Sequence, residues 1–598
     1  MSLSLALTGL DTSNPIPGIY AELRFAQGET GGDLGPKKML VLAPKTSAGS
    51  MTADTQVVGP LSDEADVITY AGTGSIGHAM CARILKLNKS INLYLAAPTA
   101  ATGSAAVEKI TFVNAATGAG VHTVFVCGKK YQTAIVSGDA IATIATNVAA
   151  TLNNDTSLPF TAGAALGVVT LTARVAGEEY NSIRIRCEIT SGITTTTTLT
   201  ADTAFGASGA GGAAIGVGTI SYTTVLATIL GTRFHYIVPA VQVAAPIDAL
   251  LDQVSTQAEP STGFRQKVVV GSCLTPSNAT TLASGASMNR PRARLVNQEE
   301  GPEPHYMIAA TAAAVFAKIE ASDPSYNFDG YGLHANDNFP LQRPYNDSAI
   351  PTTTEVKSML NNGVTPIGVN VNGAAYIVRS VTTYCLNGAS YDYRARDSSV
   401  VAVGDAFTDD TVAAIGAAPW THITGDPANI SQQPAAKFCT PKRMASLIEG
   451  KVYDYLAAGY LDPDKVTDML ESIQTGQDPT LPTRMNSVVP IYSAVLLHQH
   501  ALLVKESSAA ALPDNTTTQP QRPRRHASLR GPGPFPFVPP TRPRRATWPA
   551  ISFTNRRRFS STRSASPSAS RSTSRTCRAP ATSSRWSRAS PVSALAPR

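Results

Sequence analysis

The composition changes abruptly near residue 507, and this change limits how much of the chain can fold. Residues 508–598 hold 17 arginines, 14 prolines and one acidic residue, Asp514, with no lysine or glutamate, so this stretch carries a net charge of +16. The remaining residues carry a net charge of −9. So polar and Pro-rich a segment cannot bury enough apolar surface to offset its conformational entropy. We therefore predict a disordered Arg/Ser/Pro-rich tail over 508–598 and a folded body that ends near residue 507.

The origin of this tail is open between three explanations. Lysine disappears after Lys505, whereas functional basic segments normally use lysine as well as arginine, and this pattern is typical of a GC-rich message translated out of frame. The alternatives are a tail that binds nucleic acid by neutralising phosphates, and a linker or partner-binding segment. We favour the out-of-frame product, expect no nucleic-acid partner, and infer nothing about the body from these residues.

The body is long and moderately apolar, which favours several folded domains. The chain has 598 residues, of which 43% are hydrophobic and 15% charged, and this length is more than one hydrophobic core usually fills. It contains no run of about 18 apolar residues, and residues 1–13 lack the basic start of a secretory signal. We therefore expect a soluble protein that is made in the cytosol and does not enter a membrane.

The cysteines favour neither disulfides nor a metal site. They are odd in number, scattered, and nowhere spaced C-x-x-C, so we predict buried free thiols. The seven positions are Cys81, Cys127, Cys187, Cys273, Cys385, Cys439 and Cys577.

The N-terminal residues predict an extended strand that precedes the first core strand. Within 15–25, Ile19, Ala21 and Leu23 alternate with polar or larger residues, which indicates a strand with two unlike faces. Gly and Pro separate this segment from the apolar run 39–43. A strand held away from the core in this way is free to pair with another sheet.

A formal G-x-G-x-x-G motif lies in the next region. Residues 65–97 predict a strand over 65–71, a turn, a helix over 76–87 and a strand over 91–97, and the turn reads Gly72-Thr-Gly74-Ser-Ile-Gly77. A dinucleotide site also needs an acidic residue about 20 positions further on, and residues 92–99 contain none. A tight turn with Ser75 near the helix start explains the glycines without a cofactor.

Residues 98–215 predict a small inserted α+β module. Its one amphipathic helix spans 139–153, where Ile141, Ile144, Val148 and Leu152 share a face. Its predicted strands are 109–113, 122–127, 167–173 and 182–189. A Thr run at 194–198 and a Gly/Ala stretch to 218 mark its end.

From residue 234 onward, strands and helices alternate, which favours a mainly parallel sheet covered by helices. The predicted strands are 235–239, 266–271, 293–297, 366–370 and 376–384, and the predicted helices are 246–257, 278–285, 306–321 and 353–361. An irregular stretch is expected over 397–437. A strong helix follows, with Thr440 as N-cap and Pro441 at its first position, then a helix over 462–474 and a closing apolar segment over 487–504.

No group of residues predicts catalysis. His498 and His500 share a strand face but lack a third metal ligand. The acids Glu299, Glu300 and Glu303 beside His305 fit a charged loop before a helix better than acid–base chemistry. A third group of oxygen-bearing residues has no EF-hand spacing and is Asp323, Asp329, Asp337, Asn327, Asn336 and Asn338. We expect no enzyme, no cofactor and no catalytic or metal-binding residues.

Five short segments, taken in order, resemble the N-terminal half of contractile phage tail sheath proteins of the Mu-like type. The segments are Asn14-Pro-Ile-Pro-Gly-Ile-Tyr20, Lys37-Lys-Met-Leu-Val-Leu-Ala43, Tyr70-Ala-Gly-Thr-Gly-Ser-Ile-Gly77, Leu93-Tyr-Leu-Ala-Ala-Pro98 and Gly103-Ser-Ala-Ala106. The alternating α/β region resembles the sheath core often described as subtilisin-like, although no Ser-His-Asp set can be assigned. Residues 484–505 resemble the final segment of such proteins. The resemblance covers about 1–507 and stops where the composition changes.

The resemblance implies an α/β plus α+β multidomain protein with a helix-covered mixed sheet core, an inserted mainly β protrusion and extended terminal arms. The implied parts are an N-terminal arm and linker (1–36), the first part of an N-terminal α/β domain (37–97), the protrusion (98–215), the α/β core (216–395), a C-terminal domain and arm (396–507) and the tail (508–598). Both arms would add strands to neighbouring subunits, through Ile19, Ala21 and Leu23 at one end and Val488, Val489 and Ile491 at the other.

It also implies a structural role. Sheath subunits form stacked hexameric rings around a tail tube in the host cytoplasm, become part of the virion tail, and contract to drive the tube through the host envelope. The implied partners are further copies of the chain, the tube protein, and baseplate and terminator proteins, with Lys442 and Arg443 as the expected tube contact. A phage tail and a headless injection device both fit. The competing hypotheses are a glycan-binding surface adhesin and a dinucleotide enzyme.

Overall fold

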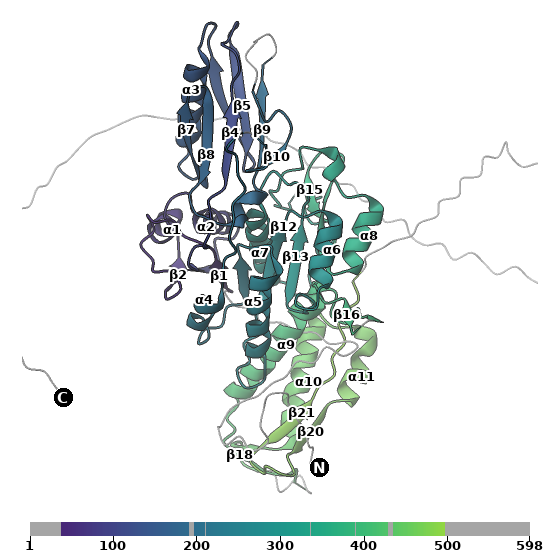
Figure 1. Ribbon diagram of the computed structural model, residues 1–598. Coiled ribbons are helices and arrows are strands. Elements are labelled where there is room, and N and C mark those ends of the chain that lie inside the picture. Colours follow the sequence, from purple (N-terminus) through teal and green to yellow (C-terminus); the bar gives the residue numbers. More distant parts are fainter. Residues whose placement is uncertain are drawn as a thin grey trace, which may run out of the picture. The chain divides into compact units, whose positions relative to one another are not determined.

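The computed structural model describes residues 37–496 apart from 191–196, 210, 335, 389 and 428–433 (Figure 1). These residues lie within the first of the chain's two compact units, Met1–Leu503. The predictions for Ile19, Ala21 and Leu23, for His498 and His500, and for the tail fall outside the described residues.

The centre of this unit is an eight-stranded sheet with the order β15-β14-β13-β12-β11-β1-β3-β2. Six strands run parallel, and β2 and β15 pair antiparallel at the two edges. The bounds are β1 (Lys38–Leu42), β2 (Val57–Leu61), β3 (Asn92–Ala96), β11 (Tyr236–Pro239), β12 (Lys267–Ser272), β13 (Ala293–Asn297), β14 (Val364–Val369) and β15 (Ala375–Ile377). The predicted mainly parallel sheet is therefore confirmed, and strands from 37–97 and from 216–395 share it.

Helices cover both faces of this sheet (Figure 1). In β1, Met39 and Val41 join the hydrophobic cluster on one face, whereas Leu40 and Leu42 join the cluster on the other, as strand alternation requires. The flanking helices are α2 (Ile76–Leu87), α4 (Thr223–Thr228), α5 (Ala244–Gln257), α6 (Pro276–Ser284), α7 (His305–Glu320) and α8 (Thr353–Asn361). Helix α7 is apolar on all sides, and 13 of its 16 residues are buried, so it is a central core helix.

The inserted segment forms two antiparallel sheets and one helix, α3 (Ile141–Asn153). One sheet has the order β10-β9-β5-β6 and the other β4-β8-β7. The strands are β4 (Val107–Thr111), β5 (Gly120–Val126), β6 (Lys129–Ile135), β7 (Phe160–Ala165), β8 (Val168–Ala173), β9 (Arg184–Ile189) and β10 (Thr203–Ala204). The predicted helix is confirmed, with Ile144, Val148 and Leu152 buried. Strands β6 and β7 were missed because each buries only two residues, Thr133 and Ile135 in β6 and Phe160 and Ala162 in β7, which is too few to give a clear apolar alternation.

The C-terminal segment is built from helices and two small sheets of two strands each, β18–β19 parallel and β20–β21 antiparallel. Its elements are α9 (Ser398–Ala417), β18 (His422–Ile423), β19 (Phe438–Cys439), α10 (Pro441–Ala457), α11 (Val466–Glu471), β20 (Gln474–Gln477) and β21 (Met485–Val488). The Thr440 hydroxyl accepts a hydrogen bond from the Arg443 N–H, which confirms the predicted N-cap of α10.

Two predictions of local structure are wrong. Residues 65–71 form not a strand but helix α1 (Glu64–Ala71), because Asp63 caps it and two acids occupy its first turn. The stretch 397–437 is not irregular throughout, because α9 begins at Ser398 and runs for 20 residues. The first half of α9 is buried on nearly every side, so it lacks the polar face that marks an amphipathic helix.

Six cysteines lie in the described part of the chain, and all six are free thiols. Cys81, Cys187, Cys385 and Cys439 are buried, as predicted, while Cys127 and Cys273 are half-buried. Across the described residues, every helix is too short or too polar to cross a bilayer.

Candidate functional site

The G-x-G-x-x-G turn lies between helices α1 and α2, not between a strand and a helix. Gly72 has φ +80°, and a Cβ there would lie 2.1 Å from the Thr46 hydroxyl oxygen. The Gly74 N–H donates to His78 Nδ1 at 3.2 Å, and the Ser75 hydroxyl accepts from the His78 N–H at 2.9 Å. The glycines therefore serve a compact helix–helix turn, and the strand–turn–helix context of a dinucleotide site is absent here.

The acidic group lies in a loop directly before α7, as predicted, but its carboxylates are engaged within the fold. Glu303 is 3% exposed and pairs with Arg83 of α2, while burial raises the pKa of its carboxyl. Glu300 pairs with Arg184 of β9 at 3.1 Å. These carboxylates hold three separate parts of the chain together, which leaves them poorly placed to exchange protons with a substrate.

Both ring nitrogens of His305 also have partners within the fold. Its Nε2 lies 2.8 Å from the Ala240 carbonyl oxygen and its Nδ1 lies 2.7 Å from the Ser182 hydroxyl. Burial lowers the pKa of His305 to about 4, so the ring is neutral at physiological pH. The side chain thereby links α7 to the base of the inserted segment.

A cation–π stack continues this contact between the inserted segment and the main sheet unit. The Arg186 guanidinium lies 5.3 Å from the ring centres of both Phe125 and Tyr345. At the adjacent β5–β6 turn, Cys127 and Gly128 have positive φ, and the Gly128 carbonyl accepts a hydrogen bond from Gln342. We name the contacts of Glu300, Glu303, His305, Arg186 and Gln342 the module junction. Sequence patterns missed it because most of its partners, such as Arg184 with Glu300 and Gly128 with Gln342, lie more than 100 residues apart.

Glu179 is an unusual group beside this junction. It is 2% exposed, and neither carboxyl oxygen has a hydrogen-bond partner among the described residues. Burial, with a smaller contribution from Glu178, raises the pKa of Glu179 to about 7. Hydrogen bonds surround it: the Glu178 N–H donates to the Gly218 carbonyl, and the Asn181 side-chain amide donates to the Gly216 carbonyl and accepts from the Gly216 N–H. The carboxyl therefore sits where the inserted segment leaves and rejoins the chain.

The aspartates of the third predicted group cap turns. The Asp323 carboxylate accepts hydrogen bonds from the Ser325 N–H and hydroxyl at 2.9 and 2.7 Å. The Asp337 carboxylate accepts from the Gly332 N–H at 2.9 Å. These bonds are the usual role of aspartate in loops.

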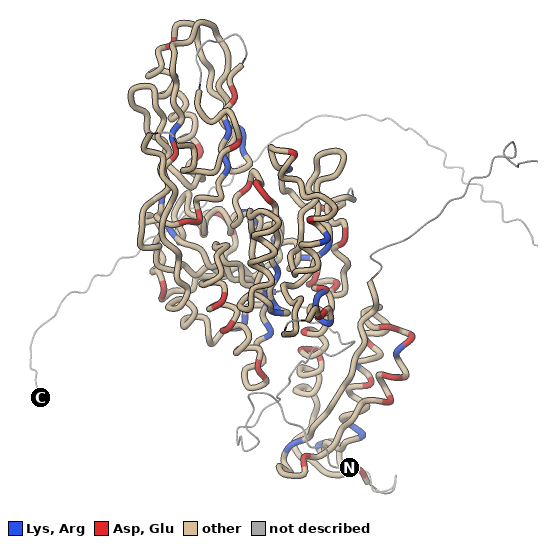
Figure 2. Tube along the Cα trace, turned by 45° about the vertical axis from the view of Figure 1, so that its right-hand side comes forward, with Lys and Arg blue, Asp and Glu red and all other residues tan. Residues whose placement is uncertain are grey.

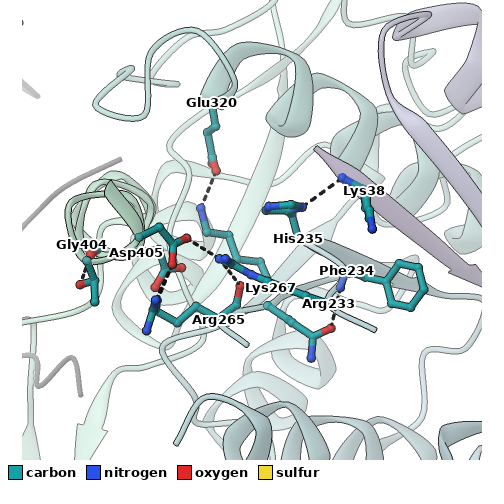
Figure 3. Close-up of polar contacts among 12 residues, drawn as sticks. Lys38, Arg233, Phe234, His235, Arg265, Lys267, Glu320, Gly404 and Asp405 are labelled. Atoms are coloured by element: carbon teal, nitrogen blue, oxygen red, sulfur yellow. Dashed lines mark hydrogen bonds and ion pairs between the residues drawn. The ribbon is translucent and has the colours of Figure 1, made fainter. Parts of the chain in front are cut away.

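The densest cluster of charge lies where the amino ends of the sheet strands meet α9 (Figures 2 and 3). We call this cluster the ionic junction and define it as Arg233, Arg265, Lys267, Arg292, Arg294, Glu320, Asp405 and Asp409. The bases stand at or just before the starts of β11, β12 and β13, Glu320 ends α7, and the aspartates come from α9. Sequence analysis missed all of these residues. The two aspartates lie in the stretch that was expected to be irregular, so no acidic partners were assigned to the bases.

Its geometry is that of a buried, hydrogen-bonded network. Arg292 Nη1 lies 2.5 Å from one Asp405 oxygen and 2.6 Å from the other. Glu320 pairs with Arg294 at 2.6 Å and with Lys267 at 2.8 Å, and it accepts a hydrogen bond from the Tyr236 hydroxyl.

The pKa shifts follow from this burial. For both Glu320 and Asp405, burial favours the neutral carboxyl, but the neighbouring cations outweigh it and leave each pKa below its usual value. Burial lowers the pKa of Lys267, and Glu320 opposes that shift. Buried pairs of this kind cost stability when one partner is removed, because the other charge remains without compensation.

Helix α9 also contacts the rest of the C-terminal segment. The Tyr455 hydroxyl of α10 donates to the Asp410 carboxylate at 2.7 Å, and the rings of Phe407 and Tyr455 meet edge to face at 5.4 Å. Asp409 and Asp410 are thus adjacent on one helix but bind different parts of the chain. Helix α9 therefore joins the main sheet to α10.

The residues predicted to contact a tube differ in exposure. Lys442 is exposed. The half-buried Arg443 guanidinium donates to the carbonyl oxygens of Pro434, Ala435 and Phe438 at 2.7–2.8 Å. Arg443 thus orders the loop before its own helix, and a tube contact there stays a prediction.

The residues of the predicted C-terminal arm begin inside the fold. Val488 ends β21 and is 39% exposed, whereas Ile491 is 2% exposed in a cluster with Val452 and Tyr455. Val489 packs against the same cluster. Because one chain cannot show a contact between subunits, their predicted role as an arm stays a prediction.

Comparison with known proteins gives one curated relative. No family model matches the chain. The "Mu-like prophage FluMu tail sheath protein" of Haemophilus influenzae is 28% identical over 191 residues, which cover 32% of this chain. The chain spans 39% of the length of that relative.

Comparison with solved structures finds sheath proteins at low identity and low TM-score. The sheath tail protein of Listeria innocua has a TM-score of 0.39 at 14% identity, covering 78% of this chain and 93% of that one. The sheath tail protein of Desulfitobacterium hafniense has a TM-score of 0.39 at 12% identity, covering 80% and 100%. The sheath of an extracellular contractile injection system in its contracted state has a TM-score of 0.40 at 11% identity, covering 83% and 99%.

Proposed function

We propose that this chain is a structural subunit of a contractile tail sheath. The observation that carries the proposal is the 191-residue match to the prophage tail sheath protein. The candidate catalytic groups support it, because Glu303 and His305 are buried and engaged within the fold. In the assembled state, copies of the chain form stacked hexameric rings around a tube, meet baseplate and terminator proteins at the ends, and contract to drive the tube into a host.

A strand exchanged between subunits supplies the linkage in this proposal. Strands β20 and β21 form a sheet of only two strands among the described residues. An isolated hairpin is marginally stable and leaves edges open to a further strand. Residues 16–25 of a neighbouring subunit and residues 488–504 are the strands that we assign to such pairing.

The two junctions give the subunit the rigidity that a contracting lattice needs. A load applied to the C-terminal segment reaches the main sheet through α9, and a load on the inserted segment reaches it through the module junction. Compact bodies linked by short strands can then change their packing without unfolding. Contraction in this scheme uses free energy stored in the assembled lattice and needs no nucleotide.

Deletion of residues 1–26 tests the proposed linkage. Sedimentation of the purified deletion variant should show single chains where the full chain forms large assemblies. Truncation after Glu506 is the matched control, because it removes the tail but neither arm, and it should assemble as well as the full chain or better. Assembly of the 1–26 deletion variant at the level of this control would contradict a linking role for the N-terminal arm.

A further inference from the structure

Three stretches of backbone meet where the inserted segment joins the main sheet unit. The chain enters the inserted segment through a connector at 101–106 and leaves it through a connector at 214–220, and the 3-10 turn Glu178–Ser182 is hydrogen-bonded to the second connector. The two connectors are tied together by the Val217 N–H, which donates to the Ser104 carbonyl at 3.0 Å. We call these three stretches the neck.

The backbones of the neck pack directly against one another. A Cβ on Gly103 would lie 1.9 Å from the Val217 carbonyl oxygen, and a Cβ on Gly216 would lie 2.1 Å from the Gly177 carbonyl oxygen. Such close approach of two backbones needs glycine. Any movement of the turn therefore changes its contacts with the connectors.

Glu179 places an ionisable side chain inside this crossing. Its carboxyl is buried, and neither oxygen has a hydrogen-bond partner among the described residues. A Cβ on Gly177 would lie 2.2 Å from Glu179 Oε2 and 3.6 Å from the Ala101 Cβ, so the carboxyl lies close to the entering connector. Burial raises the pKa of Glu179, and the nearby N–H groups of Glu179 and Ile220 offset this only in part.

The titratable groups that face Glu179 do not compensate a negative charge. Glu178 of the same turn is itself an acid. Tyr180 and Tyr222 are buried, and burial together with Glu179 raises the pKa of both hydroxyls. Arg174, which follows β8, acts on Tyr180, and its Nε already donates to a backbone carbonyl. An ionised Glu179 would therefore be a buried charge without a partner, which is unfavourable unless water reaches it.

The same turn carries a contact to α7. Ser182 ends the turn, and its hydroxyl lies 2.7 Å from His305 Nδ1. Burial keeps His305 neutral at physiological pH, so this contact supplies no positive charge to Glu179. A movement of the turn that hydrates Glu179 would also displace Ser182 from His305.

We propose that Glu179 is a protonation latch for the inserted segment: the protonated carboxyl keeps the neck closed, and the ionised carboxylate opens it by drawing in water. Opening separates the turn Glu178–Ser182 from the connectors and loosens the contact of the inserted segment with α7. This inference goes beyond the proposed sheath function, because it concerns the attachment of the inserted segment within one chain.

The direction of the pH dependence follows from the two states of the neck. The pKa of Glu179 is about 7 in the closed neck, and it returns toward the ordinary 4.5 when the neck opens. The open state therefore binds the proton less tightly and gains population as the pH rises through this range. From full protonation to pH 8, the ratio of open to closed neck should increase on the order of 100-fold.

Hydrogen exchange of the full chain, measured by mass spectrometry at low protein concentration, tests the latch. At pH 8, peptides that cover 101–106 and 214–220 should exchange on the order of 100-fold faster in the wild-type chain than in Glu179→Gln, whose amide stays neutral. At pH 5 the two should differ by only about fourfold. The matched control is Glu178→Gln, which alters the same turn but keeps Glu179, and it should exchange nearly as fast as the wild-type chain at pH 8.

Strands β12 and β13 distinguish opening of the neck from unfolding of the whole chain. They should stay protected at pH 8 after the neck has exchanged. The wild-type chain alone gives a second test, because neck protection corrected for the intrinsic exchange rate should fall on the order of 50-fold from pH 5 to pH 8. Equal neck exchange in the wild-type chain and Glu179→Gln at pH 8, neck protection that ignores pH, or exchange of the neck together with β12 would each overturn the proposal.

Discussion

The ionic junction and the module junction each attach another part of the chain to the main sheet, but they do so with different interactions. The ionic junction joins the sheet to α9 through a few buried charges that depend on one another. The module junction joins the sheet to the inserted segment through separate contacts, namely a cation–π stack, a neutral histidine, the Arg184–Glu300 ion pair and the Gln342–Gly128 hydrogen bond. Removing one residue from a buried charge network leaves its partner charge uncompensated and costs much of the network's stabilisation. Removing one of several independent contacts costs only the stabilisation of that contact. We therefore expect the two junctions to respond differently to mutation and to pH.

The largest expected effect is that of Asp405→Ala in the ionic junction. The substitution leaves Arg292 buried without a carboxylate, and we expect the free energy of unfolding to fall by about 3–5 kcal/mol in urea titrations. The matched control is Asp252→Ala, which removes the partner of Arg290 from an exposed pair and should cost less than about 0.5 kcal/mol. Equal losses for the two variants would show that the ionic junction is not the concentrated network described above.

The pH response should be centred on Glu179 at the base of the inserted segment. Its pKa is raised from 4.5 to about 7 in the folded state, so the folded protein binds the proton more tightly than the unfolded chain. Its contribution to stability is therefore lost as the pH rises from about 4.5 to 7. Glu179→Gln should raise the free energy of unfolding by about 3 kcal/mol at pH 8 and change it little at pH 4.

Glu188→Gln is the control for this pH dependence, because Glu188 lies on the same segment with an exposed side chain. Thermal melts of both variants at pH 4, 6 and 8 give the comparison. A stabilisation by Glu179→Gln that is independent of pH would contradict titration of the buried carboxyl.

The smallest expected effect is that of Tyr345→Ala in the module junction. Loss of one face of the Arg186 stack should cost about 1 kcal/mol, because Phe125 and the other contacts remain. Hydrogen exchange should increase locally around Phe125 and leave α9 unchanged. Tyr453→Ala, on the exposed side of α10, serves as the matched aromatic control. If Tyr345→Ala lowered the free energy of unfolding as much as Asp405→Ala, the module junction would depend on single residues as strongly as the ionic junction does.

The sequence predicted those parts of the fold that depend on local patterns. The parallel strands are short apolar runs, of which β11, β12 and β13 are each followed by a helix, and Thr440 with Pro441 marks the start of α10. Helix α1 was mistaken for a strand because its Val-Ile-Thr-Tyr run has high strand propensity, which the Asp63 cap overrides. Helix α9 was missed because tertiary burial removed the amphipathic pattern.

The junctions depend on contacts that no local pattern reveals. Arg292 and Asp405 are separated by 113 residues, and Ser182 and His305 by 123. Sequence alone identified Glu303 and His305 as polar groups before a helix, but it could not show that both are buried. Their surroundings come from the inserted segment, whose placement against the main sheet is a property of the whole fold.

Negative-stain electron microscopy of the purified full-length chain tests the central claim most directly. A sheath subunit should form hollow, cross-striated cylinders of constant width, in addition to any free chains. Single particles with the dimensions of one chain, seen at every protein and salt concentration tried, would contradict the account.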